Sequence, residues 1–171
     1  FLELTASEIA EKVLIDVGTG SGCLGITAKL ERSNLSVILS DISKPALNVA
    51  EKNANALNAD VHIQQQSLLN GQLKPVDYIF ANLPYVDKNW DVSPELQYEP
   101  KIALFAEDEG LKLILQLISQ APRCLTSEGL LFIEADPQQH NRIIDEAVKN
   151  GFVKERVLNY ILVMRFTGAK D

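Results

Sequence analysis

A glycine-rich stretch near the start of the chain lies between two carboxylates. It reads Asp-Val-Gly-Thr-Gly-Ser-Gly from Asp16 to Gly22, and Asp41 ends the next β-rich run. Glycines that lead into a helix expose bare N–H groups and the positive end of the helix dipole, which attract anionic ligand groups. A diphosphate would nevertheless be repelled by Asp16, because like charges about 4 Å apart cost roughly 4 kcal/mol at an effective dielectric constant of about 20. We therefore expect a ligand that carries a positive charge at this place.

The second carboxylate narrows the class of ligand. Asp41 lies where α/β proteins place the acid that accepts hydrogen bonds from ribose hydroxyls, a feature common to sites for dinucleotides and for S-adenosylmethionine. The ammonium and sulfonium groups of S-adenosylmethionine match Asp16, whereas a pyrophosphate does not. The sequence therefore predicts an S-adenosylmethionine site, with a dinucleotide site and a purely structural strand-to-helix turn as the alternatives.

A second motif, Asn82-Leu83-Pro84-Tyr85, follows the fourth β-rich run. Methyl transfer is an in-line displacement, so the nucleophile must be held on the axis of the sulfur–methyl bond. If Asn82 Oδ1 and the main-chain carbonyl of Leu83 each accept one N–H of a planar amide or aryl amine, its lone pair turns toward the methyl group, and two such bonds supply about 3 to 6 kcal/mol in the transition state. We expect Pro84 to stiffen this turn and Tyr85 to stack on the planar group. The alternative is a plain turn at the end of a strand.

Short β-rich runs alternate with helical patterns along the whole chain, which is typical of a mainly parallel sheet covered by helices. We expect strands at Val13–Val17, Ser36–Ser40, Val61–Gln65, Val76–Ala81, Leu130–Ala135, Phe152–Leu158 and Tyr160–Phe166. The last two have almost nothing between them, so they must form an antiparallel hairpin at one edge of the sheet.

Three segments carry apolar residues at helical spacing. The first is capped by Ser43 and has Pro45 in its first turn, and the third begins at Asp136 and stops near Gly151. The expected buried faces are Leu47, Ala50, Ala54 and Leu57 in the first; Leu113, Ile114, Leu117, Ile118 and Ala121 in the second; and Ile143, Ile144, Ala147 and Val148 in the third.

Length and composition fit one globular domain, with 171 residues of which 46% are hydrophobic. The net charge of −7 disfavours a bare nucleic-acid surface, although an acidic protein can still contact a basic partner. We find no run long enough to cross a membrane and no secretory signal, and the two cysteines lack metal or redox spacing. His62 and His140 also lack partners at metal spacing. We therefore expect a cytoplasmic protein without a metal site.

The stretch from Tyr85 to Glu109 fits neither a helix nor a strand. It contains Trp90, Pro94 and Pro100 among several charges. A long irregular insert in a compact domain is usually functional, so we predict a substrate loop here.

Taken together, Asp16–Gly25, Asp41 and Asn82–Tyr85 resemble a class I S-adenosylmethionine-dependent methyltransferase that modifies an amino nitrogen. The stretch YEPKIALFAEDEGL, Tyr98–Leu111, is similar to the segment that follows this motif in the release-factor glutamine methyltransferase family. The likeness extends in order from about Val13 to Phe166.

This resemblance implies a Rossmann-like α/β fold, with a seven-stranded, mainly parallel sheet, an antiparallel last strand and helices on both faces. It implies S-adenosylmethionine as cofactor and the glutamine side-chain amide of a peptide chain release factor as substrate. The implied cofactor contacts are Asp16, Gly18, Thr19, Gly20, Gly22, Asp41, Ile42, Ser67, Leu68 and Asn82. The implied catalytic residues are Asn82, Leu83, Pro84 and Tyr85, and the substrate contacts are Asn82, Tyr85, Glu99 and Pro100.

The sequence departs from the family pattern in several places. Leu83 replaces a proline, Gln66-Ser67 replaces Gly-Asp, and EADPQQ from Glu134 to Gln139 replaces Glu-His-Gly-x-x-Gln. The family's N-terminal helical domain is absent, so we expect residues 1–171 to form one catalytic domain. Asn-Leu-Pro-Tyr also resembles the motif of ribosomal RNA adenine dimethyltransferases. Methylation of an exocyclic amino nitrogen in RNA or DNA, and a cofactor-binding partner protein with weak activity, are therefore the alternative functions.

Overall fold

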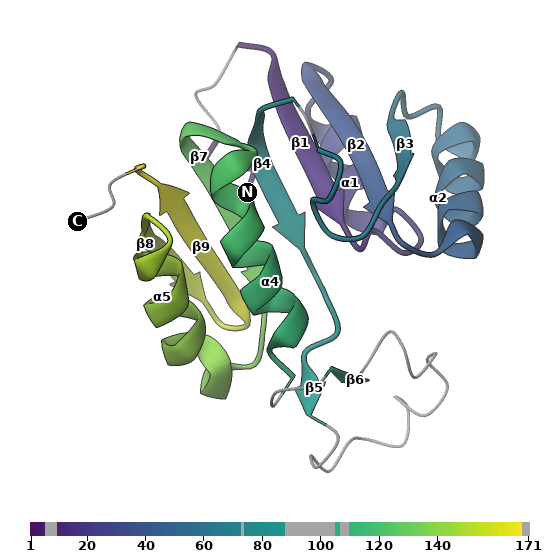
Figure 1. Ribbon diagram of the computed structural model, residues 1–171. Helices are drawn as coiled ribbons and strands as arrows, with labels where there is room; N and C mark the ends of the chain where they lie inside the picture. The colour runs from purple at the N-terminus through teal and green to yellow at the C-terminus, as the bar shows by residue number, and fades with distance from the viewer. Residues whose placement is uncertain (6–9, 73, 88–104, 107–109, 169–171) are drawn as a thin grey trace.

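A seven-stranded sheet forms the centre of the molecule in a computed structural model that describes residues 1–5, 10–72, 74–87, 105–106 and 110–168 (Figure 1). The strands are β1 Lys12–Val17, β2 Leu35–Asp41, β3 His62–Gln65, β4 Val76–Ala81, β7 Leu125–Glu134, β8 Phe152–Leu158 and β9 Ile161–Phe166. Their spatial order is β3-β2-β1-β4-β7-β9-β8. The first five are parallel, and β9 runs antiparallel between β7 and β8. The predicted sheet and its edge hairpin are confirmed.

Helices cover both faces of the sheet, as predicted. Helices α1 Cys23–Glu31 and α2 Lys44–Ala56 pack on one face, and α4 Lys112–Gln120 and α5 His140–Lys149 pack on the other. The short 3-10 turns η2 Ala121–Arg123 and η3 Pro137–Gln139 adjoin α4 and α5. Each helix buries a narrow apolar stripe, which is what fixes its orientation on the sheet.

The three helices lie where the sequence patterns predict them, but α5 begins at His140 rather than at Asp136, because the 3-10 turn η3 occupies Pro137–Gln139. Ser43 caps α2 as expected, since its Oγ accepts a hydrogen bond from Ala46 N at 3.3 Å. The prediction that Leu57 is buried is wrong: its exposed fraction is 54%, because α2 ends at Ala56. The prediction for Val148 is also wrong, with 56% exposed, because it lies beside the buried stripe of Ile143 and Ala147 rather than on it.

The strand β7 begins five residues earlier than its apolar pattern predicts. The start at Leu125 is followed by exposed Ser127 and Glu128, and Glu128 has a left-handed backbone with φ 66°. The pairing of β7 with β4 shifts its register in this region. Such a bulge interrupts the alternation of apolar and polar residues, so the pattern becomes regular only from Leu130.

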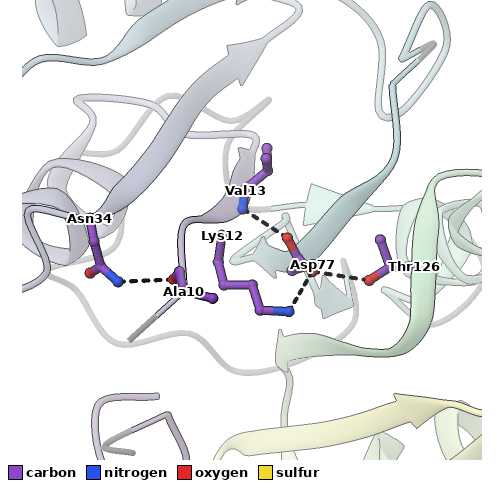
Figure 2. Close-up of polar contacts among 6 residues, drawn as sticks. All are labelled: Ala10, Lys12, Val13, Asn34, Asp77 and Thr126. Carbon is purple, nitrogen blue, oxygen red and sulfur yellow. Dashed lines mark hydrogen bonds and ion pairs between the residues drawn. The ribbon is translucent and has the colours of Figure 1, made fainter. Parts of the chain in front are cut away.

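Asp77 connects the amino ends of β1, β4 and β7 by hydrogen bonds (Figure 2). Its Oδ1 accepts hydrogen bonds from Lys12 Nζ at 2.9 Å and Thr126 Oγ1 at 3.2 Å, and its Oδ2 accepts one from Val13 N at 2.9 Å. In the same view Asn34 Nδ2 donates to Ala10 O at 3.0 Å. These contacts set the position of β1 at the end of the sheet opposite to the glycine-rich loop.

We expect Asp77→Ala to lower the free energy of unfolding by about 1 to 3 kcal/mol, because it removes the acceptor for a main-chain N–H and an ammonium group. Urea denaturation measures this change. Asp77→Asn keeps one acceptor oxygen and should lose less. Equal stability of the alanine variant and the unmodified chain would show that Asp77 has no such role.

Candidate active site

The predicted motifs meet at one edge of the sheet. The glycine-rich loop follows β1, Asp41 ends β2 and Asn82 follows β4. Since β1 pairs with β2 on one side and with β4 on the other, Val17 lies in register with both Ser40 and Ala81. The order of the strands reverses at β1, because β2 lies on one side of it and β4 on the other. Ligands bind α/β sheets at such a switch point.

The glycine-rich loop is anchored to β2 and leans on the second motif. Gly18 N and Thr19 N both donate to Ser40 O, at 2.8 and 3.0 Å. Gly18 has φ 69°, and a Cβ there would lie 2.7 Å from Leu83 Cδ2. A Cβ on Gly20, in contrast, would meet no atom of the described residues within 4 Å. The loop is therefore closed toward Leu83 and open at Gly20, where a ligand can approach the main chain.

Asp16 lies beneath this loop, with only 2% of its surface exposed. Its Oδ2 accepts hydrogen bonds from Thr19 Oγ1 at 2.6 Å and from Gly25 N at 3.0 Å. Within the described part of the chain, Oδ1 accepts none. Burial raises the pKa of the Asp16 carboxyl group, and the two hydrogen bonds and the charge of Asp41 affect it less. A positive group beside Oδ1 would offset the cost of keeping the buried carboxylate charged.

Asp41 joins the loop to the start of α2. Its Oδ2 accepts a hydrogen bond from Gly20 N at 3.0 Å, and its Oδ1 accepts one from Ser43 N at 2.8 Å. Each carboxylate oxygen retains a second lone pair, so the group can still accept a hydroxyl. Asp41 lies at the end of β2, and the ribose contact stays a prediction.

Three further residues predicted as cofactor contacts, Ile42, Ser67 and Leu68, lie near Asp41 at this edge of the sheet. Gln66 N donates to Asp41 O at 3.1 Å, which brings the turn after β3 next to the end of β2. Ile42 is 66% exposed and Ser67 is also exposed, so both side chains are available to a ligand. Leu68 packs into the core, with 9% exposed, so its main chain is the part that a ligand could reach.

The Asn82–Tyr85 turn extends from the end of β4 over the switch point. Asn82 is exposed, whereas Leu83 is 5% exposed and packs into the core. Tyr85 is half-buried, and its hydroxyl donates to Glu134 Oε1 at 3.2 Å. Burial, followed by the charge of Glu134, raises the pKa of Tyr85 to about 12. Tyr85 is therefore a neutral hydrogen-bond donor at physiological pH.

The phenol of Tyr85 gives a pH-dependent expectation. Its pKa in the folded chain is raised from 10.0 to about 12, so its contribution to stability is fully present below pH 10 and is lost as the pH rises toward about 12. We expect the stability of the unmodified chain to fall more steeply over this window than that of Tyr85→Phe. Urea denaturation at several alkaline pH values checks this, and parallel curves for the two proteins would contradict it.

The predicted substrate loop is described only at its two ends. The strand β5 Val86–Asp87 pairs in parallel with β6 Phe105–Ala106, so the segment leaves and returns at the same place beside Tyr85. Figure 1 shows this pair beyond the carboxyl end of β4. Trp90, Glu99 and Pro100 lie outside the described residues.

Two contacts to Tyr85 were not predicted. Glu134, at the end of β7, accepts the Tyr85 hydroxyl, and Gln139 Nε2 donates to Tyr85 O at 2.8 Å. Asp136, where the third helix was expected to begin, caps the 3-10 turn η3 that leads into α5, since its Oδ1 accepts a hydrogen bond from Gln138 N at 2.9 Å. The spacing from Asp136 to Gln139 is that of a capping box, which directs the glutamine back toward the strand end. That spacing could have identified Gln139.

Neither a metal cluster nor a membrane helix is present in the described part of the chain. No group of three or more His, Cys, Asp or Glu residues there could hold a metal ion. No described helix is long and apolar enough to cross a membrane.

Comparison with known proteins identifies the class. Residues 1–98 match the model of the methyltransferase small domain, and the chain belongs to this family. It is 38% identical over 141 residues to the release factor glutamine methyltransferase of Enterococcus faecalis, covering 80% of this chain and 50% of that protein. It is 39% identical over 134 residues to the ribosomal protein uL3 glutamine methyltransferase of Francisella tularensis, covering 74% of this chain and 42% of that protein.

A solved structure supports the same fold. The ribosomal protein L11 methylase of Lactobacillus delbrueckii superimposes with a TM-score of 0.69 and 27% identity, covering 97% of this chain and 76% of that one. The predicted Rossmann-like fold and the methyltransferase class are thus confirmed. The chain spans about half the length of the curated relatives it matches.

Proposed function

We propose that this chain is the catalytic domain of an S-adenosylmethionine-dependent methyltransferase that methylates the glutamine side-chain amide of a peptide chain release factor. The observation that carries the proposal is the position of Asn82. It is exposed at the end of β4, and the next residue, Leu83, packs against the glycine-rich loop at Gly18. The names of several relatives at 32 to 38% identity support the choice of substrate.

The residues present fit S-adenosylmethionine. Buried Asp16 suits the amino-acid ammonium group, and the loop at Gly20 is open to the methionine part of the ligand. Asp41 would accept the ribose hydroxyls, with Ile42, Ser67 and the Leu68 main chain on the side of the base. When bound, this cofactor supplies an electrophilic methyl group on a positively charged sulfur.

The Asn82–Tyr85 turn would prepare the substrate nitrogen. Asn82 Oδ1 and the Leu83 carbonyl each accept one N–H of the glutamine amide, which directs the nitrogen lone pair toward the methyl group. Bound S-adenosylmethionine would supply the methyl group, and the two acceptors would hold the amide nitrogen in place while it loses one proton to water. The two acceptors stabilise the positive charge that develops on the nitrogen.

Transfer of a labelled methyl group tests the proposal. The chain is incubated with labelled S-adenosylmethionine and either a purified release factor or ribosomal RNA. We expect label on a glutamine of the release factor. Label on RNA instead would favour the adenine alternative, and tight cofactor binding without any labelled product would favour a partner protein with weak activity.

A further inference from the structure

The junction between β7 and α5 contacts Tyr85 at its hydroxyl group and at its main-chain carbonyl. Glu134 Oε1 accepts the Tyr85 hydroxyl at 3.2 Å, and Gln139 Nε2 donates to the Tyr85 carbonyl at 2.8 Å. Glu134 is the last residue of β7 and Gln139 is the last residue of η3. One short segment of chain thus fixes both the ring and the main chain of Tyr85.

The amide of Gln139 has a defined orientation. Its side chain is 4% exposed, and its Oε1 accepts a hydrogen bond from Asp136 N at 3.2 Å while Nε2 donates to Tyr85. The capping box at Asp136 therefore fixes which end of the Gln139 amide carries the oxygen and which carries the nitrogen. The nitrogen, which is the donor, faces the Tyr85 carbonyl.

A third segment closes over the same hydrogen bond. Gly110 has φ 83°, and a Cβ there would overlap the Tyr85 carbonyl and lie 2.7 Å from Gln139 Nε2. Main chain thus packs directly on the Gln139–Tyr85 contact from the far end of the predicted substrate loop. This packing partly buries the hydrogen bond, and partial burial strengthens it.

The turn has few other supports. In the part of the chain that the structure describes, the Asn82 side chain makes no hydrogen bond. The turn is held by β4 at one end and by the packing of Leu83 in the middle. At the other end it is held by the two contacts of Tyr85 and by the pairing of the following strand, β5, with β6. A loss of the Gln139 contact removes the hydrogen bond to the main-chain carbonyl at this end and thereby loosens the turn.

We infer that Gln139 is a positioning residue for methyl transfer: by holding the Tyr85 carbonyl it fixes the direction of Asn82 Oδ1 and the Leu83 carbonyl. This inference rests on the proposed function of the turn. An error of about 1 Å in the placement of reacting groups can cost on the order of a hundredfold in rate. Gln139 acts through the turn and does not itself contact the reacting atoms.

The test uses two substitutions of Gln139 and a matched control. Gln139→Glu keeps the length of the side chain and an acceptor for Asp136 N but loses the donor to Tyr85, and Gln139→Met loses both. Gln138→Met changes the neighbouring glutamine, which is exposed, and leaves the contact between Gln139 and Tyr85. The measurements are kcat and KM with a release factor, the cofactor dissociation constant, the melting temperature, and amide hydrogen exchange in residues 82–87.

We expect both Gln139 variants to lower kcat by about tenfold or more, with KM and the cofactor dissociation constant within about twofold. Amide exchange in residues 82–87 should become faster in both. Gln138→Met should keep the kcat and the melting temperature of the unmodified chain. Unchanged kcat in the Gln139 variants, or an equal loss in Gln138→Met, would overturn the inference.

Amide exchange separates this inference from the proposed function. If the unmodified chain transfers no methyl group to a release factor, the proposed function fails whatever Gln139 does. Exchange in residues 82–87 still decides whether Gln139 holds the turn, since it needs no substrate. Unchanged exchange in both Gln139 variants would overturn the inference independently of activity.

Discussion

Replacing Asn82 with alanine is expected to lower kcat for methyl transfer by about 100- to 1,000-fold, the usual effect of removing one group that stabilises charge in a transition state. The affinity for S-adenosylmethionine should stay within a few fold, because the side chain lost is an exposed amide and the loop at Gly18–Gly22 is untouched. Single-turnover transfer of a labelled methyl group and calorimetric titration measure the two quantities.

Asn82→Asp is the matched variant for this prediction. It keeps an acceptor oxygen at the same place, so it should retain more activity than Asn82→Ala. Activity of the alanine variant equal to that of the unmodified chain would refute the assigned role. A parallel loss of cofactor affinity would mean that Asn82 mainly supports the cofactor site.

Asp16→Asn is expected to weaken the binding of S-adenosylmethionine about 10- to 100-fold, which corresponds to roughly 1.5 to 3 kcal/mol for a hydrogen bond to a charged group. The free chain should be no less stable, since the substitution removes a charge that burial makes unfavourable. Calorimetric titration measures the affinity, and urea denaturation measures the stability.

The pH dependence of binding gives an independent check on Asp16. Its pKa in the folded chain is raised above 3.8, so the stability that the neutral carboxyl group provides is present at low pH and is lost as the pH rises through the raised value. A cationic ligand prefers the charged form, so its affinity should increase over the same rise in pH. The asparagine variant should lack this increase. Equal affinity of the two proteins at neutral pH would exclude a direct role for the carboxylate.

Local patterns predicted the framework of the site well. The bounds of β4 and β8 agree with the sequence patterns, and the three motifs meet because carboxyl ends of parallel strands share one edge. Ser43 was also predicted as a cap from residue type and position alone. These features depend on residues close together in the chain.

Features that depend on distant contacts escaped prediction. The residues that hold Tyr85 lie 49 and 54 positions away, so no local pattern connects them to the turn. The hydrogen bonds that the Asp16 carboxyl group accepts from Thr19 and Gly25 were not predicted either. The start of β7 was not predicted because the bulge after Leu125 interrupts the alternation of apolar and polar residues, and the prediction relied on that alternation.

The parallel pairing of β5 with β6 has an evolutionary consequence. Because the two ends of the intervening segment are already joined, its length can change at little cost, with each doubling adding about 0.6 kcal/mol of closure entropy. β5 and β6 form a sheet separate from the central one, so insertions between them leave the register of the central sheet unaltered. On the proposed function, related enzymes that differ in this segment are expected to methylate different proteins while they keep the groups at the ends of β1, β2 and β4.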